Sequence, residues 1–272
     1  MINEDELYER VKKNLYNLTG ITLCEHKDVM ISNRLDKLKR NIKFNNSNDE
    51  LLKKIENSQY QTEFVNAFTT NKTNFFREEF HFLDFKNRIL KEKTDNLKIF
   101  CCASSSGEEP YSIAITLKDS NNYTNSHIIA TDIDTDILNK AQNGIYKYNK
   151  TVQEFPSWLK INKYFKKKVG INIDNNDALL KINSDIKKLI TFAKLNLNDD
   201  TYPFNYNEFD VIFCRNVLIY FSLEDQNIIL KKLFKYLKIG GTLYLGHSES
   251  AQDLISYVNK VDQNTFIKIK EI

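Results

Sequence analysis

Apolar residues recur at helical spacing through the first 93 residues, and no segment before residue 97 has the pattern of a strand. Residues 4–19 and 26–42 each predict an amphipathic helix, the first ending at Gly20. Their expected buried faces are Leu7, Val11, Leu15 and Leu18, and Met30, Ile31, Leu35, Leu38 and Ile42. Further helical patterns follow, so we expect an all-α domain over residues 1–93.

From residue 97 onward, short apolar runs alternate with helical patterns, which predicts an α/β fold with a mostly parallel sheet covered on both faces. The expected strands lie within 97–103, 127–133, 189–197, 209–217, 240–247 and 265–272, and the expected helices are 109–119, 135–143 and 223–237. A short link at 256–264 predicts that the last strand is antiparallel. Residues 145–189 break the alternation and predict an insertion with its own small structure.

Composition narrows the class of protein. The 272 residues are 41% hydrophobic and 28% charged, with a formal net charge of +3, which is too small to indicate nucleic-acid binding. No apolar run approaches the roughly 18 residues of a membrane span, and the acidic N-terminus is unlike a signal peptide. We therefore expect a cytoplasmic protein. The cysteines show no metal-ligand spacing, and we expect core thiols and no metal site; they are Cys24, Cys101, Cys102 and Cys214.

The first predicted strand runs into a polar turn, ASSSGEEP, residues 103–110, that contains one of only seven glycines. In open α/β sheets, ligands bind beyond the carboxyl ends of the strands. Gly107 and the serines before it would let the backbone approach a ligand, and Pro110 suits a first helical turn.

The charges of this turn indicate which ligand it would accept. A dinucleotide-binding turn has three glycines and leaves its helix N-terminus free for phosphate, whereas Glu108 and Glu109 would repel phosphate here. S-adenosylmethionine has a sulfonium and an ammonium group and no phosphate. Asp132, at the end of the next strand, can accept hydrogen bonds from ribose hydroxyls. The alternative is that the glutamates only stabilise the helix N-terminus.

Five blocks of sequence together resemble the chemotaxis receptor methyltransferases, the CheR family. They are FTTNKTNFFRE (68–78), ASSSGEEPYSIAI (103–115), ATDIDTDILNKAQNGIY (130–146), FDVIFCRNVLIYF (209–221) and GGTLYLGHSES (240–250). The resemblance implies a class I S-adenosylmethionine-dependent methyltransferase domain over 94–272, with a small β-subdomain inserted at about 161–195. It also implies methyl transfer to glutamate side chains of methyl-accepting chemotaxis receptors, forming methyl esters.

The resemblance further implies roles for individual residues. Expected cofactor-binding residues are Asn71, Thr73, Arg77, Ala103, Gly107, Glu109, Asp132, Asn196, Leu197, Arg215 and Asn216. Arg77 and Tyr220 are expected to orient the substrate carboxylate. Asp134 is expected to cap the next helix. His247 is not assigned as a base, because a glutamate with a pKa of about 4.3 is already ionised.

Receptor docking is expected on the basic face of residues 26–42. Lys27, Arg34, Lys37 and Arg40 lie near one helical face, opposite the apolar residues, and the family implies that this face meets the acidic receptor bundle. The alternative is a solvated face. The insertion contains one glycine, Gly170, and is lysine-rich, so we expect an enzyme that does not capture a receptor C-terminal pentapeptide. We expect a monomer with no nucleic-acid partner.

Two other classes of function, and a related enzyme with another substrate, are the alternatives that the residues leave open. A nucleotide-dependent dehydrogenase is disfavoured by the missing glycines and the paired glutamates. A non-catalytic sensor that binds S-adenosylmethionine without transferring its methyl group would not need Arg77, Asn216 and Tyr220. A related enzyme acting on RNA or a small molecule is disfavoured by the modest net charge and the lack of a long basic, aromatic-interleaved surface.

Overall fold

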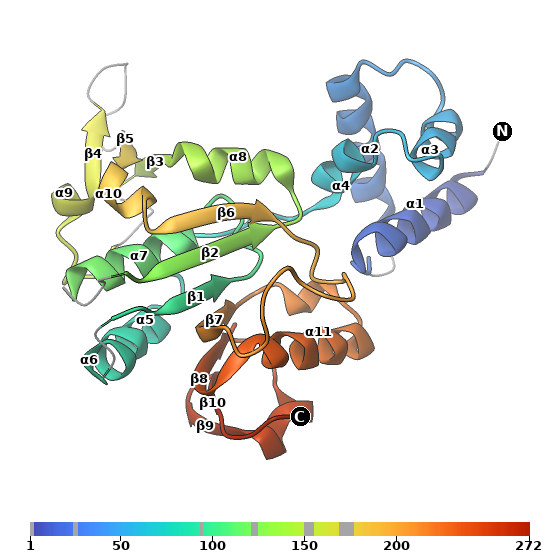
Figure 1. The fold of residues 1–272 in the computed structure, drawn as a ribbon. Coiled ribbons are helices and arrows are strands. Elements are labelled where there is room, and N and C mark those ends of the chain that lie inside the picture. Colours follow the sequence, from blue (N-terminus) through green and yellow to red (C-terminus); the bar gives the residue numbers. More distant parts are fainter. Residues whose placement is uncertain (1–2, 24–26, 93–94, 121–124, 150–154, 169–176) are drawn as a thin grey trace.

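The computed structural model describes residues 3–23, 27–92, 95–120, 125–149, 155–168 and 177–272. Four helices form an N-terminal unit to one side of the sheet (Figure 1): α1 (Glu4–Thr19), α2 (Asp28–Ile42), α3 (Asn48–Glu56) and α4 (Gln61–Phe68). The Asn3 side chain accepts a hydrogen bond from Glu6 N at 2.7 Å and caps α1, which ends at Gly20 with φ 76°. The predicted end of this helix is confirmed.

The core of the helical unit contains the apolar faces that the sequence predicts. Its buried side chains are Leu7, Val11, Leu15, Ile31, Leu35, Leu38, Leu51, Leu52, Ile55, Phe64 and Phe68. Leu18, Met30 and Ile42 pack against this cluster while remaining partly exposed. Burial of these faces, at roughly 25 cal/mol per Å² of apolar surface, drives the association of four helices that would be marginal alone.

The next helical segment packs with the sheet. It comprises α5 (Phe80–Asp84), a π-helical turn η1 (Phe85–Ile89) and α6 (Leu90–Glu92). Phe75, Phe76, Phe82 and Phe85 are buried in the same cluster as strand residues of the sheet. The expected helical domain of residues 1–93 therefore packs as two parts. Helices α1–α4 share one core, whereas the phenylalanine-rich segment after residue 74 packs against the sheet.

The main sheet has seven strands in the order β6-β2-β1-β7-β8-β10-β9. Neighbouring pairs from β6 to β8 are parallel, and β10 is antiparallel to both β8 and β9, which confirms the expected antiparallel last strand. The expected link at 256–264 itself contains strand β9. The strands are β1 (Lys98–Cys101), β2 (His127–Asp132), β6 (Ile190–Lys194), β7 (Phe209–Cys214), β8 (Leu237–Leu245), β9 (Val258–Asp262) and β10 (Thr265–Lys268).

Helices cover both faces of this sheet (Figure 1). Alternate residues of β1 point to opposite faces: Ile99 packs with α7 (Glu108–Asp119), and Phe100 packs in the cluster of α11 (Leu223–Tyr236). Helix α8 (Thr135–Asn143) follows β2, and the 3₁₀ turns η2 (Leu218–Tyr220) and η3 (Gln252–Tyr257) follow β7 and β8. This is the expected doubly covered α/β fold of class I methyltransferases.

A second, three-stranded antiparallel sheet has the order β3-β5-β4. Its elements are β3 (Ile145–Asn149), α9 (Ile161–Tyr164), β4 (Phe165–Lys168), β5 (Asp177–Ile182) and, following them, α10 (Ser184–Lys187). The expected insertion at 161–195 is thus displaced at both ends. Its first strand directly follows Gly144, and residues 190–194 pair with β2 in the main sheet. Gly170 lies outside the described residues.

Three of the cysteines are free and buried in the sheet core, namely Cys101, Cys102 and Cys214, while Cys24 lies outside the described residues. Within the ranges that the structure describes, no helix is long and apolar enough to cross a membrane.

Candidate active site

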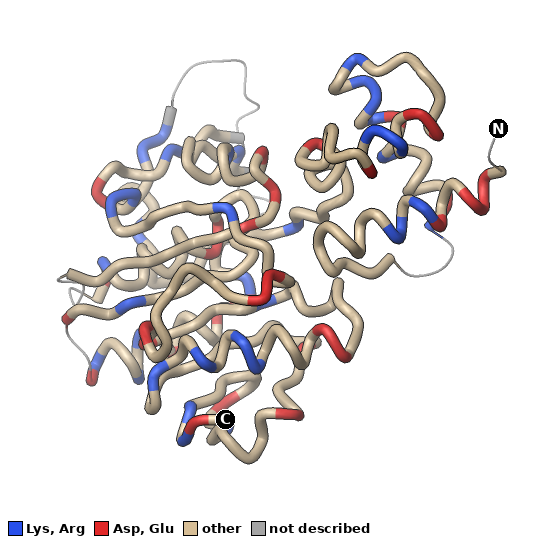
Figure 2. Tube along the Cα trace, turned by 45° about the vertical axis from the view of Figure 1, so that its right-hand side comes forward, with Lys and Arg blue, Asp and Glu red and all other residues tan. Residues whose placement is uncertain are grey.

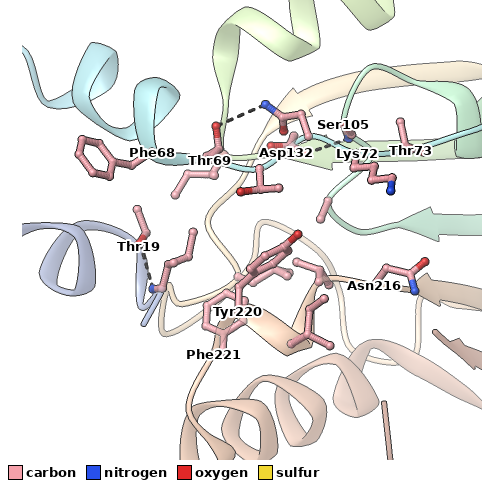
Figure 3. A pocket seen from close by; sticks show the side chains of 18 of the residues that line it. Thr19, Phe68, Thr69, Lys72, Thr73, Ser105, Asp132, Asn216, Tyr220 and Phe221 are labelled. Carbon is pink, nitrogen blue, oxygen red and sulfur yellow. Dashed lines mark hydrogen bonds between the residues drawn. The ribbon is translucent and has the colours of Figure 1, made fainter. Parts of the chain in front are cut away.

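A cavity of about 430 Å³ lies at the carboxyl ends of β1, β2 and β7, against the helical unit. This volume is in the range of small-molecule sites. Figure 3 shows Thr69, Asp132 and Ser105 on one side of the cavity and Tyr220 and Phe221 on the other. The predicted site residues that line it are Arg34, Asn71, Thr73, Arg77, Ala103, Glu109, Asp132, Asn196, Leu197, Arg215, Asn216 and Tyr220.

Gly107 is absent from the lining of this cavity, and its expected role in giving a ligand clearance stays a prediction. Its φ is 97°, and a Cβ at this position would lie 2.9 Å from Ala141 Cβ and 3.0 Å from Tyr146 Oη. Glycine is required because the backbone is left-handed and α8 packs directly against the turn. The residues that approach the cavity are Ala103 and Ser105, which also have positive φ values of 47° and 50°.

Asp132, at the end of β2, is 7% exposed at the cavity wall. Its carboxylate accepts hydrogen bonds from Ser105 N at 2.8 Å and from Asp134 N at 3.0 Å. Burial raises its pKa to about 6, although these N–H donors favour the charged form. A buried carboxylate with spare lone pairs at the end of the second strand is suited to accept hydrogen bonds from vicinal hydroxyl groups.

Asp134 caps α8, as expected, by accepting hydrogen bonds from Asp136 N and Ile137 N at 3.0 Å. Its second oxygen accepts from Thr69 Oγ1 at 2.6 Å and from the Asn71 amide at 2.7 Å. Asn71 therefore has a structural role in addition to its expected contact with the ligand. Its side chain ties the segment between α4 and α5, which forms one wall of the cavity, to the N-terminus of α8.

Arg215, whose side chain is fully buried, lies between two carboxylates. Its Nη1 is 2.7 Å from Glu109 Oε2, and its Nη2 is 3.1 Å from Glu78 Oε2 and 2.5 Å from the carbonyl oxygen of Arg77. Burial raises the pKa of Glu109, and the positive charge of Arg215 opposes that rise. The sequence did not identify Glu78, although it directly follows Arg77 in the FFRE segment.

Asn216 has φ 57°, and its backbone is held by Glu249, a second residue that the sequence did not identify. The buried Glu249 carboxylate accepts from Asn216 N at 2.9 Å, from Val217 N and Leu218 N at 2.8 Å, and from Gly246 N at 2.6 Å. Glu249 lies in the GHSES segment, where only His247 was considered. His247 is exposed and lies outside the lining of the cavity.

Comparison with known proteins identifies the family. Residues 71–267 match the model of the CheR methyltransferase, SAM binding domain. The chain belongs to the CheR methyltransferase family. A chemotaxis protein methyltransferase of Borreliella burgdorferi is 37% identical over 263 residues, which cover 92% of this chain and 89% of that one. Proteins of the same name from Escherichia coli and Salmonella typhimurium are 34% and 33% identical, over 92% and 98% of this chain and 86% and 91% of theirs.

The lining of the cavity fits the cofactor of this family, S-adenosylmethionine. Glu78, Glu109 and Asp132 place three carboxylates in or beside the cavity, which disfavours a phosphate and favours a ligand with cationic groups and hydroxyls. Apolar side chains supply a surface for a flat aromatic ring; among them are Ile21, Met30, Phe68, Leu197 and Val217. Ile21, Met30 and Phe68 come from the helical unit, which the sequence did not associate with cofactor binding.

Asn196 and Leu197 reach the cavity from the loop after β6. The Asn196 amide donates to Leu18 O at 3.1 Å, and its side-chain oxygen accepts from Asn198 N at 3.0 Å. Asn196 thus joins the end of α1 to the sheet unit of this CheR-family chain, and its side chain is already engaged there.

Arg77 and Tyr220 both line the cavity of this family member. The Arg77 guanidinium donates to Lys72 O at 3.3 Å and has no salt bridge within the described part of the chain. Tyr220 ends η2, and its carbonyl oxygen accepts a hydrogen bond from Thr22 N at 2.9 Å. Arg77 and Tyr220 therefore reach one cavity from different loops, and their expected role in orienting the substrate carboxylate stays a prediction.

The expected basic docking face of α2 stays a prediction, and its basic residues differ in their surroundings. Arg34 is turned inward: its guanidinium donates to Phe68 O, to Thr69 O at 3.2 Å and to Thr70 Oγ1 at 3.0 Å. Burial lowers its pKa. Lys37 and Arg40 are exposed on α2, and Figure 2 shows lysine and arginine positions along the helical unit. Free carbonyl oxygens at the end of α4 attract Arg34 because an unpaired buried carbonyl is costly.

Proposed function

We propose that this protein transfers a methyl group from S-adenosylmethionine to glutamate side chains of methyl-accepting chemotaxis receptors, forming glutamate methyl esters. The observation that carries the proposal is the shared cavity. Cofactor-type residues Asp132 and Glu109 line the same space as Arg77 and Tyr220, which suit a substrate carboxylate. The names of the relatives, chemotaxis protein methyltransferases, support the receptor as substrate.

The reaction requires the protein mainly to hold the cofactor and the substrate carboxylate in the right positions. When bound, the cofactor supplies an electrophilic methyl group on a sulfonium. A glutamate carboxylate with a pKa of about 4.3 is ionised near neutral pH and is already a nucleophile, so no general base is needed. Holding two reactants in line and excluding water is worth up to roughly 7–11 kcal/mol.

Arg77 and Tyr220 perform this placement in the proposed reaction. Arg77 donates charge-assisted hydrogen bonds to one carboxylate oxygen, and Tyr220 donates through its hydroxyl. The carboxylate loses its charge during transfer, so a very strong arginine contact would stabilise the ground state more than the transition state. Arg77 therefore orients the substrate and contributes little to charge stabilisation.

Receptor docking completes the proposal. Lys37 and Arg40 present positive charge on the outer surface of α2, and acidic receptor helices would be attracted to this face. We place the protein in the cytoplasm as a monomer that needs no receptor C-terminal peptide, with a docking unit built on α1–α4 and a catalytic unit built on the sheet.

The test is a transfer assay with methyl-labelled S-adenosylmethionine and receptor-containing membranes from the same cell. Washed membranes are treated with alkali, and volatile methanol is counted. Base-labile label on receptor-sized bands is expected, together with loss of label for Arg77→Ala and a reduced rate for Tyr220→Phe. Cofactor binding without base-labile label would reject the receptor assignment and favour a sensor.

A further inference from the structure

Glu78 links three segments that meet at the cavity. Its carboxylate accepts from Arg215 Nη2 at 3.1 Å and from Asn216 Nδ2 at 3.1 Å, and His247 N lies 3.4 Å from Oε1. Glu78 itself has φ 57°, a conformation that a non-glycine residue keeps only when its surroundings hold it there. These contacts therefore fix the side chain in one place.

The hydrogen bond between Glu78 and Asn216 fixes the orientation of the Asn216 side-chain amide. Burial opposes ionisation of Glu78, but Arg215 and the hydrogen bond from Asn216 outweigh it and lower its pKa, so Glu78 is a carboxylate near neutral pH. A carboxylate can only accept hydrogen bonds, so the Asn216 NH₂ group must point at Glu78. The backbone N of Asn216 is already held by Glu249. Asn216 lines the cavity, and its amide oxygen is the group of its side chain that remains able to accept a hydrogen bond from a ligand.

We propose that Glu78 is a positioning residue for cofactor binding, acting through Asn216 by turning the amide oxygen of Asn216 toward the bound ligand. The ligand's identity rests on the proposed function. An acceptor at this position is suited to an ammonium group, which can only donate. Without Glu78 the amide is free to rotate and present its NH₂ group, which repels an ammonium.

The neighbouring glutamate provides a matched control. Glu79 accepts from Trp158 Nε1 at 3.2 Å and is absent from the lining of the cavity. Glu78→Gln and Glu79→Gln therefore remove the same charge one residue apart, and only the first touches Arg215 and Asn216.

The experiment measures the Kd of S-adenosylhomocysteine by calorimetry, with no methyl acceptor present. Glu78→Gln is expected to weaken binding about tenfold, and Glu79→Gln by less than about twofold, because only Glu78 makes charge-assisted hydrogen bonds at the site. Asn216→Asp places two carboxylates in contact and is expected to weaken binding at least as much as Glu78→Gln.

The deciding variant combines Glu78→Gln with Asn216→Asp. In this variant the donor and the acceptor are exchanged, since the amide at position 78 donates to the carboxylate at position 216. Asp also tolerates the left-handed backbone at position 216. Binding by the double variant is expected to be tighter than by Asn216→Asp alone, so Glu78→Gln strengthens binding in one background and weakens it in the other. A role of Glu78 that does not act through Asn216 predicts weakening in both.

Equal weakening in both backgrounds, or wild-type affinity for Glu78→Gln, overturns the proposal. If Glu78→Gln does not fold by circular dichroism, Glu78→Asp replaces it: a carboxylate withdrawn by one methylene should also weaken binding, and unchanged affinity would reject the role. Failure of the wild-type protein to bind S-adenosylhomocysteine would instead count against the proposed function.

Discussion

Arg215 Nη1 and Glu109 Oε2 lie 2.7 Å apart, although 106 positions separate the two residues in the chain. One ends the fourth parallel strand of the sheet, and the other lies in the first turn of the helix after β1. The pair therefore joins the end of β7 to the helix after β1 within the lining of the cavity, and its burial makes the contact energetically important.

Removal of the Arg215 side chain is expected to destabilise the protein by about 3–5 kcal/mol, because Glu109 and Glu78 would be left as largely buried charges without the cation that pairs with both. The measurement is urea unfolding of Arg215→Ala at neutral pH. The control is Lys98→Ala, which removes an exposed partner of Glu208 at 3.0 Å and should cost less than about 1 kcal/mol. Similar losses for the two variants would contradict the assignment of Arg215 as a buried charge partner.

Cofactor affinity is expected to depend on the ionisation of Asp132. Burial raises its pKa to about 6, so the carboxylate is largely protonated below that pH and is a weaker acceptor for ribose hydroxyls. The Kd of S-adenosylhomocysteine should therefore rise as the pH falls through 6. Titration calorimetry between pH 5 and 8 checks this.

Asp132→Asn is the control for this pH dependence. The variant should bind more weakly at pH 8 and show a flatter profile, because an amide does not titrate. Glu109 and Glu249, whose pKa values burial also raises, remain in the variant. An unchanged slope in Asp132→Asn would assign the titration to one of them.

Gly107→Ala is expected to lower stability without weakening cofactor binding by the folded protein. The substitution adds backbone strain of about 1–2 kcal/mol and a steric overlap with Ala141 and Tyr146 of about 1–3 kcal/mol. Gly240→Ala is a matched control, since Gly240 has φ 78° and a methyl group added there would meet nothing within 4 Å. Thermal unfolding and calorimetry would distinguish the effects. If the fully folded Gly107→Ala variant bound the cofactor clearly more weakly than the wild type, the expected ligand role of Gly107 would be supported.

The basic residues of α2 are expected to separate into two groups. Arg34→Glu should weaken cofactor binding, because it releases the backbone of residues 68–70 that forms one cavity wall. Lys37→Glu and Arg40→Glu should leave the Kd of S-adenosylhomocysteine unchanged and lower receptor methylation, more so at low ionic strength, where surface charges act over longer distances. If Arg40→Glu weakened S-adenosylhomocysteine binding as much as it lowered receptor methylation, a docking role would be rejected.

Much of the fold follows from local pattern. The helical period of α1 and α2, the alternation of strands and helices after residue 97 and the antiparallel final strand were all predictable, because each depends on residues close in sequence. The boundary of the helical unit was not. Residues 80–92 have the same helical pattern as those before them, and only their tertiary packing against the sheet separates them.

The candidate site likewise contains residues that the sequence identified and residues that only the structure reveals. A strand end indicated Asp132, because residues following parallel strands meet at one edge of the sheet. Arg215 and Asn216 were indicated by the family resemblance. Glu78 and Glu249 act through contacts 138 and 33 positions away, which no local pattern encodes. Gly107 was correctly identified as special, but sequence could not say whether a ligand or Ala141 required the missing side chain.

The cavity wall formed by residues 21–23, Met30 and Phe68 lies outside residues 71–267, the part of the chain that matches the family model. The wall is joined to the sheet at two ends, by Asn196 with Leu18 and by Asp134 with Thr69. A gene fragment that encodes only residues 71–267 would therefore lack this wall and leave one side of the cavity open to water. Exchange of the helical unit between relatives is therefore expected to require matching changes at the contacts of Asn196 with Leu18 and of Asp134 with Thr69.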